Sequence, residues 1–287
     1  MSIRVSLQAD LREETASQLE KGLAAYYNSS PRSYYLEADR AATQYTHQIQ
    51  PFHCDLASRV RAGFSVIEVG CGSAHFCPHV EKAGGSYTGV DHGPDLLAEN
   101  RKRFPRARFV AVGTELEQTY DLVASLYTIE HVVDPQRYLR KLWDLCRPGG
   151  LIGVICPDFV DGEGYPPSFY YGITPRRLRA KIASMSLIDA LTHLTDLFIL
   201  APRWKRRARS SAPGAFWMNL APRILAGTEY TIDADAVHLP RLKDLVWWLT
   251  QRGGRILETS LSLSLVNRAV LKHNCYVLVE KPGPSNR

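Results

Sequence analysis

Long apolar runs and paired cysteines are both missing from this sequence of 287 residues. No uncharged apolar run approaches 18 residues, so we expect no membrane-spanning helix. Residues 1–10 lack the apolar stretch that a secretory signal needs. The six cysteines, at positions 54, 71, 77, 146, 156 and 275, form no C-x-x-C pair. We therefore predict a cytoplasmic protein with reduced thiols and no metal site.

A glycine turn follows the first apolar run that reads as a buried strand. Residues 66–69 form this run, and Gly70 and Gly72 come directly after it. Glycine has no Cβ, so the chain can turn sharply there and a ligand can approach the backbone. A second apolar run ends at Asp91, a carboxylate of the kind that binds both hydroxyls of a ribose. This combination predicts a site for an adenosine-containing cofactor.

Two alternatives compete for the same residues. A nicotinamide or flavin dinucleotide site requires a third glycine, which lets the helix approach a pyrophosphate, and His75 stands in that position. S-adenosylmethionine carries no phosphate, so it fits this turn better than NAD or NADP does. The glycines could also make an ordinary strand-to-helix turn, but that interpretation leaves Asp91 without a role.

Strands and helices alternate through the rest of the chain, which predicts an α/β fold with helices on both faces of a parallel sheet. Apolar residues recur at helical spacing from 134 to 146, and the Pro-Gly-Gly of 148–150 ends that helix. A second helix is predicted from Leu239 to Gly253. The remaining strands are predicted at 108–112, 120–125, 151–156, 255–260 and 275–280.

Residues 64–158 and 238–281 resemble the class I S-adenosylmethionine-dependent methyltransferases, most of all the group that methylates quinones, sterols and natural products. The matching segments are 68–73, 89–91, 121–132 and 147–151. The resemblance implies a Rossmann-like, doubly wound sheet of seven strands, mostly parallel with an antiparallel last strand, plus a largely helical insertion. It divides the chain into an N-terminal helical lid (1–60), a core (61–158 and 238–283) and an insertion (159–237) that caps the acceptor site.

The resemblance also assigns the cofactor-binding residues. Asp91 would bind the ribose and His92 would flank the adenine. The other cofactor residues are Glu68, Gly70, Cys71 and Gly72 beside the methionine part, Thr114 and Glu115 near the adenine amino group, and Ser125 and Leu126 beside the sulfonium. The Asn/Asp-Pro-Pro-aromatic signature of enzymes that methylate the amines of nucleic-acid bases is absent, which disfavours that reaction.

Methyl transfer to an alcohol also requires a base that removes the proton of the hydroxyl group. The candidates are His131, Tyr127, Glu130, His238 and Tyr171. His131 could equally shape its loop, and His238 could cap the helix that follows it. The tyrosines at 26, 27, 34, 35 and 45 would either cover the cofactor as part of the lid or pack the N-terminal segment onto the sheet.

Positive charge is concentrated in the insertion. Residues 175–209 contain nine basic and two acidic residues, a local balance of +7 in a chain whose net charge is +6. An apolar helical face, with Leu187, Ile188, Leu191, Leu194 and Phe198 on one side, precedes the basic run at 203–209. This pattern is typical of an interfacial membrane anchor, but it also fits an amphipathic helix that packs onto its own core, or a site for an acidic substrate. Nucleic acid is disfavoured because stacking aromatic residues are scarce in the run.

These observations predict a methyltransferase that uses S-adenosylmethionine and acts on a small-molecule, sugar or lipid-linked acceptor, with in-line transfer to oxygen. We expect a cytoplasmic protein and leave open peripheral association with the inner membrane surface through 203–209. The alternative from another class is a protein that binds the cofactor without transferring a methyl group and uses the basic insertion for docking. An NAD(P)-dependent oxidoreductase is the less favoured enzyme class.

Overall fold

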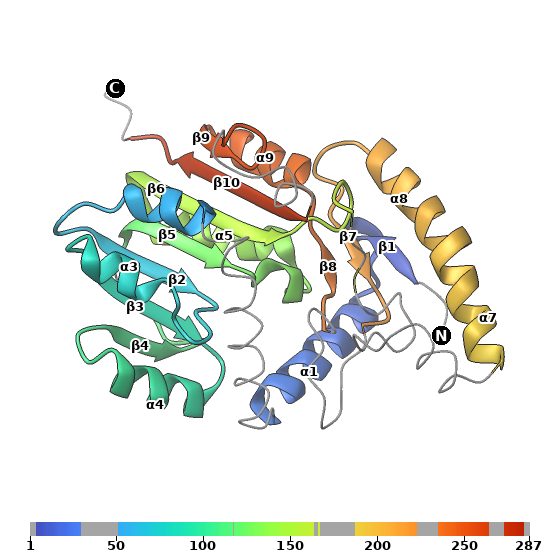
Figure 1. The fold of residues 1–287 in the computed structure, drawn as a ribbon, viewed down its shortest axis with the longest axis horizontal. Helices are drawn as coiled ribbons and strands as arrows, with labels where there is room; N and C mark the ends of the chain where they lie inside the picture. Colours follow the sequence, from blue (N-terminus) through green and yellow to red (C-terminus); the bar gives the residue numbers. More distant parts are fainter. Residues whose placement is uncertain are drawn as a thin grey trace.

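The computed structural model describes residues 4–29, 51–116, 118–163, 166, 187–222, 235–263 and 273–283. Its centre is a seven-stranded sheet in the order β4-β3-β2-β5-β6-β10-β9 (Figure 1). The sheet consists of β4 (Arg108–Ala111), β3 (Ser86–Asp91), β2 (Ser65–Val69), β5 (Tyr120–Leu126), β6 (Cys146–Pro157), β10 (Asn274–Glu280) and β9 (Arg255–Thr259). β10 runs antiparallel to both of its neighbours, while the pairs from β4 to β6 are parallel. The predicted seven-stranded α/β fold is therefore confirmed.

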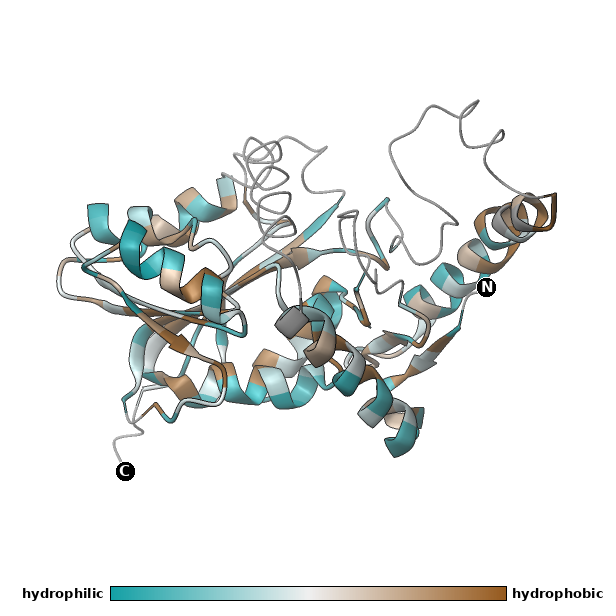
Figure 2. Cartoon of the chain, turned by 90° about the horizontal axis from the view of Figure 1, so that it is seen from below, coloured by the Kyte–Doolittle hydropathy of each residue, from teal (hydrophilic) through white to brown (hydrophobic). Residues whose placement is uncertain are grey.

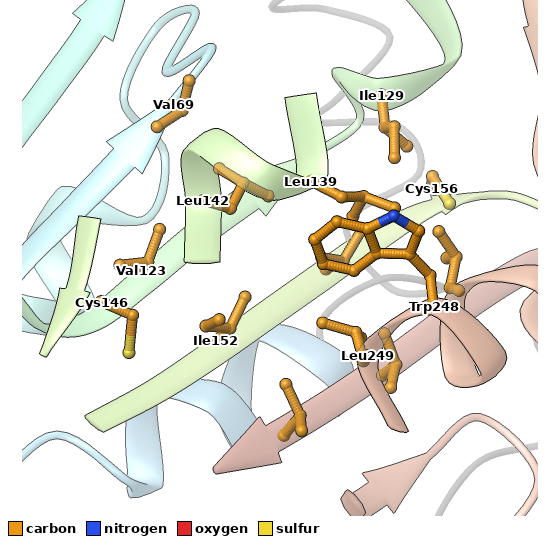
Figure 3. Packing of buried hydrophobic residues seen from close by; sticks show 14 of the residues in the cluster. Val69, Val123, Ile129, Leu139, Leu142, Cys146, Ile152, Cys156, Trp248 and Leu249 are labelled. Carbon is orange, nitrogen blue, oxygen red and sulfur yellow. The ribbon is translucent and has the colours of Figure 1, made fainter. Parts of the chain in front are cut away.

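Apolar side chains on both faces of this sheet explain why helices cover both sides. Consecutive residues of the central strands enter opposite cores: Val66 and Leu122 face one, and Ile67 and Val123 the other. The helical residues 51–58, α3 (Cys77–Lys82) and α4 (Pro94–Arg103) pack on the first face. α5 (Pro135–Leu145) and α9 (Leu242–Thr250) pack on the second, where Leu142 and Trp248 meet the strands (Figure 3).

A second, three-stranded antiparallel sheet lies beyond the carboxyl ends of the central strands (Figure 1). It pairs β1 (Val5–Leu7) with β7 (Trp217–Asn219), and β7 with β8 (His238–Leu239). The N-terminus and the insertion thus contribute strands to one sheet. Residues 5–7, predicted to belong to a helical N-terminal segment, form a strand instead.

One helix covers each face of this smaller sheet, because successive side chains of its strands point to opposite faces. Trp217 and Leu239 face α8 (Ala201–Ser210), whereas Met218 and Val237 face α1 (Glu13–Ser29). α8 continues α7 (Leu187–Thr195) through η4, a π-helical turn from Asp196 to Leu200. The remaining short elements are the 3-10 helices η1 (Gln8–Asp10) and η2 (Ile129–His131).

Two further differences from the predictions concern the insertion and its junction with the core. The helix predicted from Leu239 begins at Leu242, because Leu239 pairs with Trp217 in the smaller sheet. Lys205, predicted within an exposed basic run, is buried, and its Nζ donates to the carbonyl of Gly162 at 2.5 Å. Burial lowers the pKa of Lys205 to about 8. Among the described residues, no helix has the length and apolarity to cross a bilayer.

Candidate functional site

The turn after β2 is held against the neighbouring strands by backbone hydrogen bonds. The amides of Gly70 and Cys71 both donate to the carbonyl of Val90, at 2.8 and 3.0 Å. Gly70 has a φ of +79°, and a Cβ added there would lie 2.3 Å from the side chain of Thr128. Only glycine fits this position, because the turn after β2 touches the loop after β5. The first glycine is therefore required by packing.

The second glycine of the turn, Gly72, has different surroundings. Gly72 has a φ of +48°, and nothing lies within 4 Å of a Cβ added to it. Its amide donates to Oδ2 of Asp91 at 2.8 Å, and its carbonyl accepts from Nδ2 of Asn100 at 2.7 Å. The backbone of Gly72 is thus fixed on both sides while the space in front of it is open. Such a cradle suits a ligand that lies against bare backbone.

Asp91 ends β3 and stands beside this cradle, as predicted. Its Oδ1 accepts from the amide of His92 at 2.7 Å, and its Oδ2 accepts from Gly72. Oδ1 also accepts from the amide of Gly93 at 3.4 Å, whereas Oδ2 keeps a second lone pair that can accept a hydrogen bond from a hydroxyl group. Open space at Gly72 and a fixed, partly exposed carboxylate next to it fit the nucleoside of S-adenosylmethionine. Thr114 and Glu115 lie in the exposed turn that follows the adjacent strand β4.

Glu68, predicted to lie beside the methionine part, is in β2, two residues before Gly70. It is buried and accepts a hydrogen bond from the hydroxyl of Tyr87, which is buried as well. Burial raises the pKa of Glu68 to about 8; the bond from Tyr87 opposes the rise and the charge of Asp91 adds to it. The side chain is therefore largely protonated at neutral pH.

We expect Glu68→Gln to be increasingly more stable than the wild type as the pH rises. Between pH 4.5 and about 8, folded Glu68 keeps a proton that the unfolded chain has lost, so the wild type loses stability across this window. Glutamine has no proton to lose and can still accept the bond from Tyr87. The difference in unfolding free energy should grow by up to about 1.4 kcal/mol per pH unit and level off above pH 8. Urea unfolding at several pH values measures it, with the exposed Glu20→Gln as the control; parallel curves for the wild type and Glu68→Gln would contradict the shift.

Three aromatic side chains from distant segments meet next to Asp91. The ring of Tyr27, on α1, stacks on His92 with centroids 6.2 Å apart and 13° between the planes. The same ring meets His131 edge to face, also at 6.2 Å. Tyr27 therefore connects the residue after β3, predicted to flank the adenine, with the loop after β5. The contact places α1 beside both histidines, while Tyr34, Tyr35 and Tyr45 lie outside the described residues.

Asp235 joins these residues from the insertion and was not predicted. Its Oδ2 lies 3.2 Å from Nδ1 of His131 and accepts a hydrogen bond from the hydroxyl of Tyr27. Burial favours the protonated carboxyl, but His131 and Tyr27 outweigh it and hold the pKa of Asp235 below its ordinary value. On the other side of the ring, Nε2 of His131 is 3.8 Å from the buried carboxylate of Glu130. The imidazole thus lies between two carboxylates, with one fifth of its surface exposed.

A backbone hydrogen bond explains how Asp235 reaches this position. The amide of Val237 donates to the carbonyl of Glu130 at 2.9 Å, which anchors the start of β8 to η2. Asp235 is two residues upstream of that anchor, beside His131. The sequence around Asp235 carries no motif, and His131 is more than 100 residues away from it in the chain. Their proximity therefore follows only from the contact between the insertion and the loop after β5.

The other predicted catalytic residues lie in different surroundings. His238 is fully buried against Phe216, and its Nδ1 is 3.2 Å from the carbonyl of Ile129. Burial lowers the pKa of His238 to about 3, so the ring is neutral. Tyr127 adopts a φ of +53°, a strained conformation often found at functional sites, and its hydroxyl donates to Oδ1 of Asn274 at 2.9 Å. Tyr171 lies outside the described residues.

Ser125 and Leu126, predicted beside the sulfonium, are buried at the carboxyl end of β5. The hydroxyl of Ser125 shares a hydrogen bond of 2.9 Å with that of Tyr138, which also reaches the carbonyl of Val69 at 3.1 Å. Burial raises the pKa of Tyr138, so this network stays neutral. It ties β5 to the end of β2 below the glycine turn.

Comparison with known proteins finds related sequences and a related fold. The family described as "Methyltransferase domain" matches residues 40–259. The ubiquinone biosynthesis O-methyltransferase of Nitrosospira multiformis is 29% identical over 118 residues, which cover 37% of this chain and 49% of that protein. The enzyme of the same name from Aeromonas salmonicida is 29% identical over 125 residues, covering 38% and 50%. The chain thus spans about half the length of the curated relatives it matches.

A solved structure supports the fold over a longer span. The crystal structure of 1,6-didemethyltoxoflavin-N1-methyltransferase from Burkholderia thailandensis, with bound 1,6-didemethyltoxoflavin and S-adenosylhomocysteine, aligns with a TM-score of 0.56. The alignment covers 97% of this chain and 95% of that chain at 14% sequence identity. Together with the sheet order and the family match, it shows that this chain belongs to the class I S-adenosylmethionine-dependent methyltransferases.

Proposed function

We propose that this protein transfers a methyl group from S-adenosylmethionine to a small-molecule acceptor, with oxygen as the methylated atom. The observation that carries the proposal is the open cradle at Gly72 beside the fixed carboxylate of Asp91. Bound S-adenosylmethionine supplies an electrophilic methyl group. Gly72 and Asp91 would hold its nucleoside, and His92 and Tyr27 would cover the adenine side.

His131 is the residue that we propose as the base. Its Nδ1 lies 3.2 Å from Asp235, whereas its Nε2 is 3.8 Å from Glu130, beyond hydrogen-bond distance, so Nε2 is the nitrogen that would take the proton from the acceptor hydroxyl. The imidazolium that forms would be stabilised by Asp235 and Glu130, in the way that a buried carboxylate supports a catalytic histidine. A base placed in this way typically contributes about 100-fold to 10,000-fold, while alignment of acceptor and methyl group contributes further. In-line transfer follows from that alignment.

For the acceptor, we propose the methylated atom and a broad chemical class. The relatives that match are named O-methyltransferases of ubiquinone biosynthesis, which favours oxygen over nitrogen and carbon. The acceptor is proposed to be a small molecule, a sugar or a lipid-linked compound. Peripheral association with an anionic membrane surface would give the protein access to a lipid-linked acceptor.

We expect Asp91→Ala to weaken binding of S-adenosylhomocysteine at least tenfold, because the ribose hydroxyls lose their acceptor and Gly72 loses the bond that fixes its amide. Isothermal titration calorimetry measures the affinity directly. Asp95→Ala, which removes an exposed carboxylate four residues away on α4, is the matched control and should bind as the wild type does.

The same measurement tests the proposed function as a whole. Wild-type protein that binds S-adenosylhomocysteine and not NAD or NADP supports a methyltransferase site. Production of S-adenosylhomocysteine from S-adenosylmethionine with phenolic acceptors then separates an enzyme from a protein that only binds the cofactor. Unchanged affinity in Asp91→Ala would overturn the assigned role of Asp91.

A further inference from the structure

The helical rod formed by α7, η4 and α8 exposes large apolar side chains at the edge of the molecule. Leu187, Ile188 and Phe198 are 77%, 76% and 69% exposed. Leu191, Leu194 and Ile199 are exposed as well. Figure 2 shows hydrophobic residues along the outer end of this rod and hydrophilic ones along the part that follows. Exposed apolar groups of this number and proximity mark an interaction surface.

The opposite face of the rod packs onto the protein. Trp204 and Ala208 on α8 lie in the small core that also contains Trp217 and Leu239, and Asp196 in the π-helical turn is buried. Within the described part of the chain, the exposed apolar side chains of α7 therefore belong to no buried core. They also do not pack against either of the two described sheets.

The basic residues of α8 divide into two groups. Lys205 and Arg209 donate to carbonyls of the segment after β6, at 2.5 Å to Gly162 and 3.0 Å to Val160, so they fix that segment. Arg203 and Arg206 are exposed, and Arg207 is exposed with its guanidinium 5.6 Å from the ring of Trp217. Three of the five cations are thus exposed, and Arg206 lines a pocket together with Asp161 and Glu163.

The rod combines an apolar end with a cationic end on one exposed surface. Asp196, an acidic residue of the rod, is buried beneath it. The helix is about 36 Å long at 1.5 Å per residue, and no described helix can cross a bilayer. An amphipathic helix of this kind lies in the plane of the membrane interface, with apolar side chains at the boundary of headgroups and acyl chains.

We propose that the outer face of α7 and α8 binds the surface of an anionic lipid bilayer. Leu187, Leu191 and Phe198 enter the interface, and Arg203 and Arg206 contact lipid phosphates. Charge complementarity favours lipid over a second copy of the chain, because two such faces would bring like charges together. The inference rests on the proposed function only in that membrane binding brings the site to a lipid-linked acceptor.

Sedimentation of the full chain with vesicles tests the proposal. Wild-type protein should bind vesicles of phosphatidylcholine and phosphatidylglycerol, bind those of phosphatidylcholine alone more weakly, and lose affinity as salt is added. Calorimetry with S-adenosylhomocysteine on the same samples checks the cofactor site, so failure of membrane binding and failure of the proposed function are measured separately.

Two variants with matched controls identify the surface. Arg203→Ser/Arg206→Ser should weaken binding to anionic vesicles about 30-fold, since each arginine contributes about fivefold near such a surface. Lys102→Ser/Arg106→Ser removes the same charge from exposed positions around the end of α4 and should have little effect. Leu187→Ser/Leu191→Ser/Phe198→Ser should abolish binding, while Leu261→Ser removes a leucine that is 79% exposed elsewhere and should not.

The proposal is overturned if the wild type stays in the supernatant with anionic vesicles, or if variants and controls lose binding equally. It is also overturned if the wild type sediments as a dimer in analytical ultracentrifugation, the triple apolar variant as a monomer, and neither binds vesicles. In that case the face joins two copies of the chain. Retained binding of S-adenosylhomocysteine shows that the variants are folded.

Discussion

Replacing His131 by alanine is expected to lower kcat about 100-fold to 10,000-fold, the range that a positioned general base contributes. Asp235→Asn should lower kcat less and shift the acidic limb of the pH profile, because the carboxylate that stabilises the protonated ring is lost. Neither change touches the glycine cradle. The affinity for S-adenosylhomocysteine should therefore stay close to that of the wild type, which separates a role in proton transfer from one in cofactor binding.

Tyr27→Phe and His273→Ala serve as controls for this prediction. Phenylalanine keeps the ring that contacts His92 and His131 but cannot donate to Asp235. It should change the pH profile slightly and leave cofactor affinity intact. His273 is exposed before β10, so its removal should leave kcat unchanged. A His131→Ala variant with wild-type kcat and pH profile would show that this histidine only shapes its loop.

The sequence was sufficient to predict the parts of the fold that depend on local signals. The strand before Gly70, the strand that ends at Asp91 and the helix before Arg147 follow from apolar periodicity and from glycine and proline. Gly72 and Asp91 are 19 residues apart and belong to one strand-helix-strand unit, so their proximity can be predicted from the sequence. These elements needed no knowledge of distant pairing.

The smaller sheet could not be predicted in the same way. β1 has three residues and β8 has two, and β1 pairs with a strand from the other end of the chain, Val5 lying opposite Asn219. Strands this short have too few residues to show an alternation of apolar and polar side chains. Their register is set by contacts with α1 and α8. The proximity of Asp235 to His131 depends on this sheet. The buried state of Lys205 likewise depends on a carbonyl 43 residues away.

The ion pair of Arg241 and Asp244 fixes the insertion to the core, and Asp244→Ala should lower the free energy of unfolding by about 3–5 kcal/mol. Both side chains are buried, and the guanidinium contacts both carboxylate oxygens at 2.5 and 3.1 Å. Arg241 also donates to the carbonyls of Ala208 and Ala212, and Asp244 accepts from the amide of Gly214. Removal of the carboxylate leaves a buried cation and an unpaired amide.

A double variant distinguishes a simple ion pair from one whose side chains also bind backbone groups. An isolated buried pair can often be replaced by apolar residues of similar volume at little cost. Arg241→Met/Asp244→Leu should nevertheless remain destabilised, because the carbonyl of Ala212 and the amide of Gly214 lose their side-chain partners and the carbonyl of Ala208 loses one of its hydrogen bonds. Urea unfolding measures both variants, and Lys243→Ala, an exposed change on the same helix, should stay within about 0.5 kcal/mol of the wild type. A double variant as stable as the wild type would show that water replaces these contacts, and that the docking of the insertion depends on its apolar core alone.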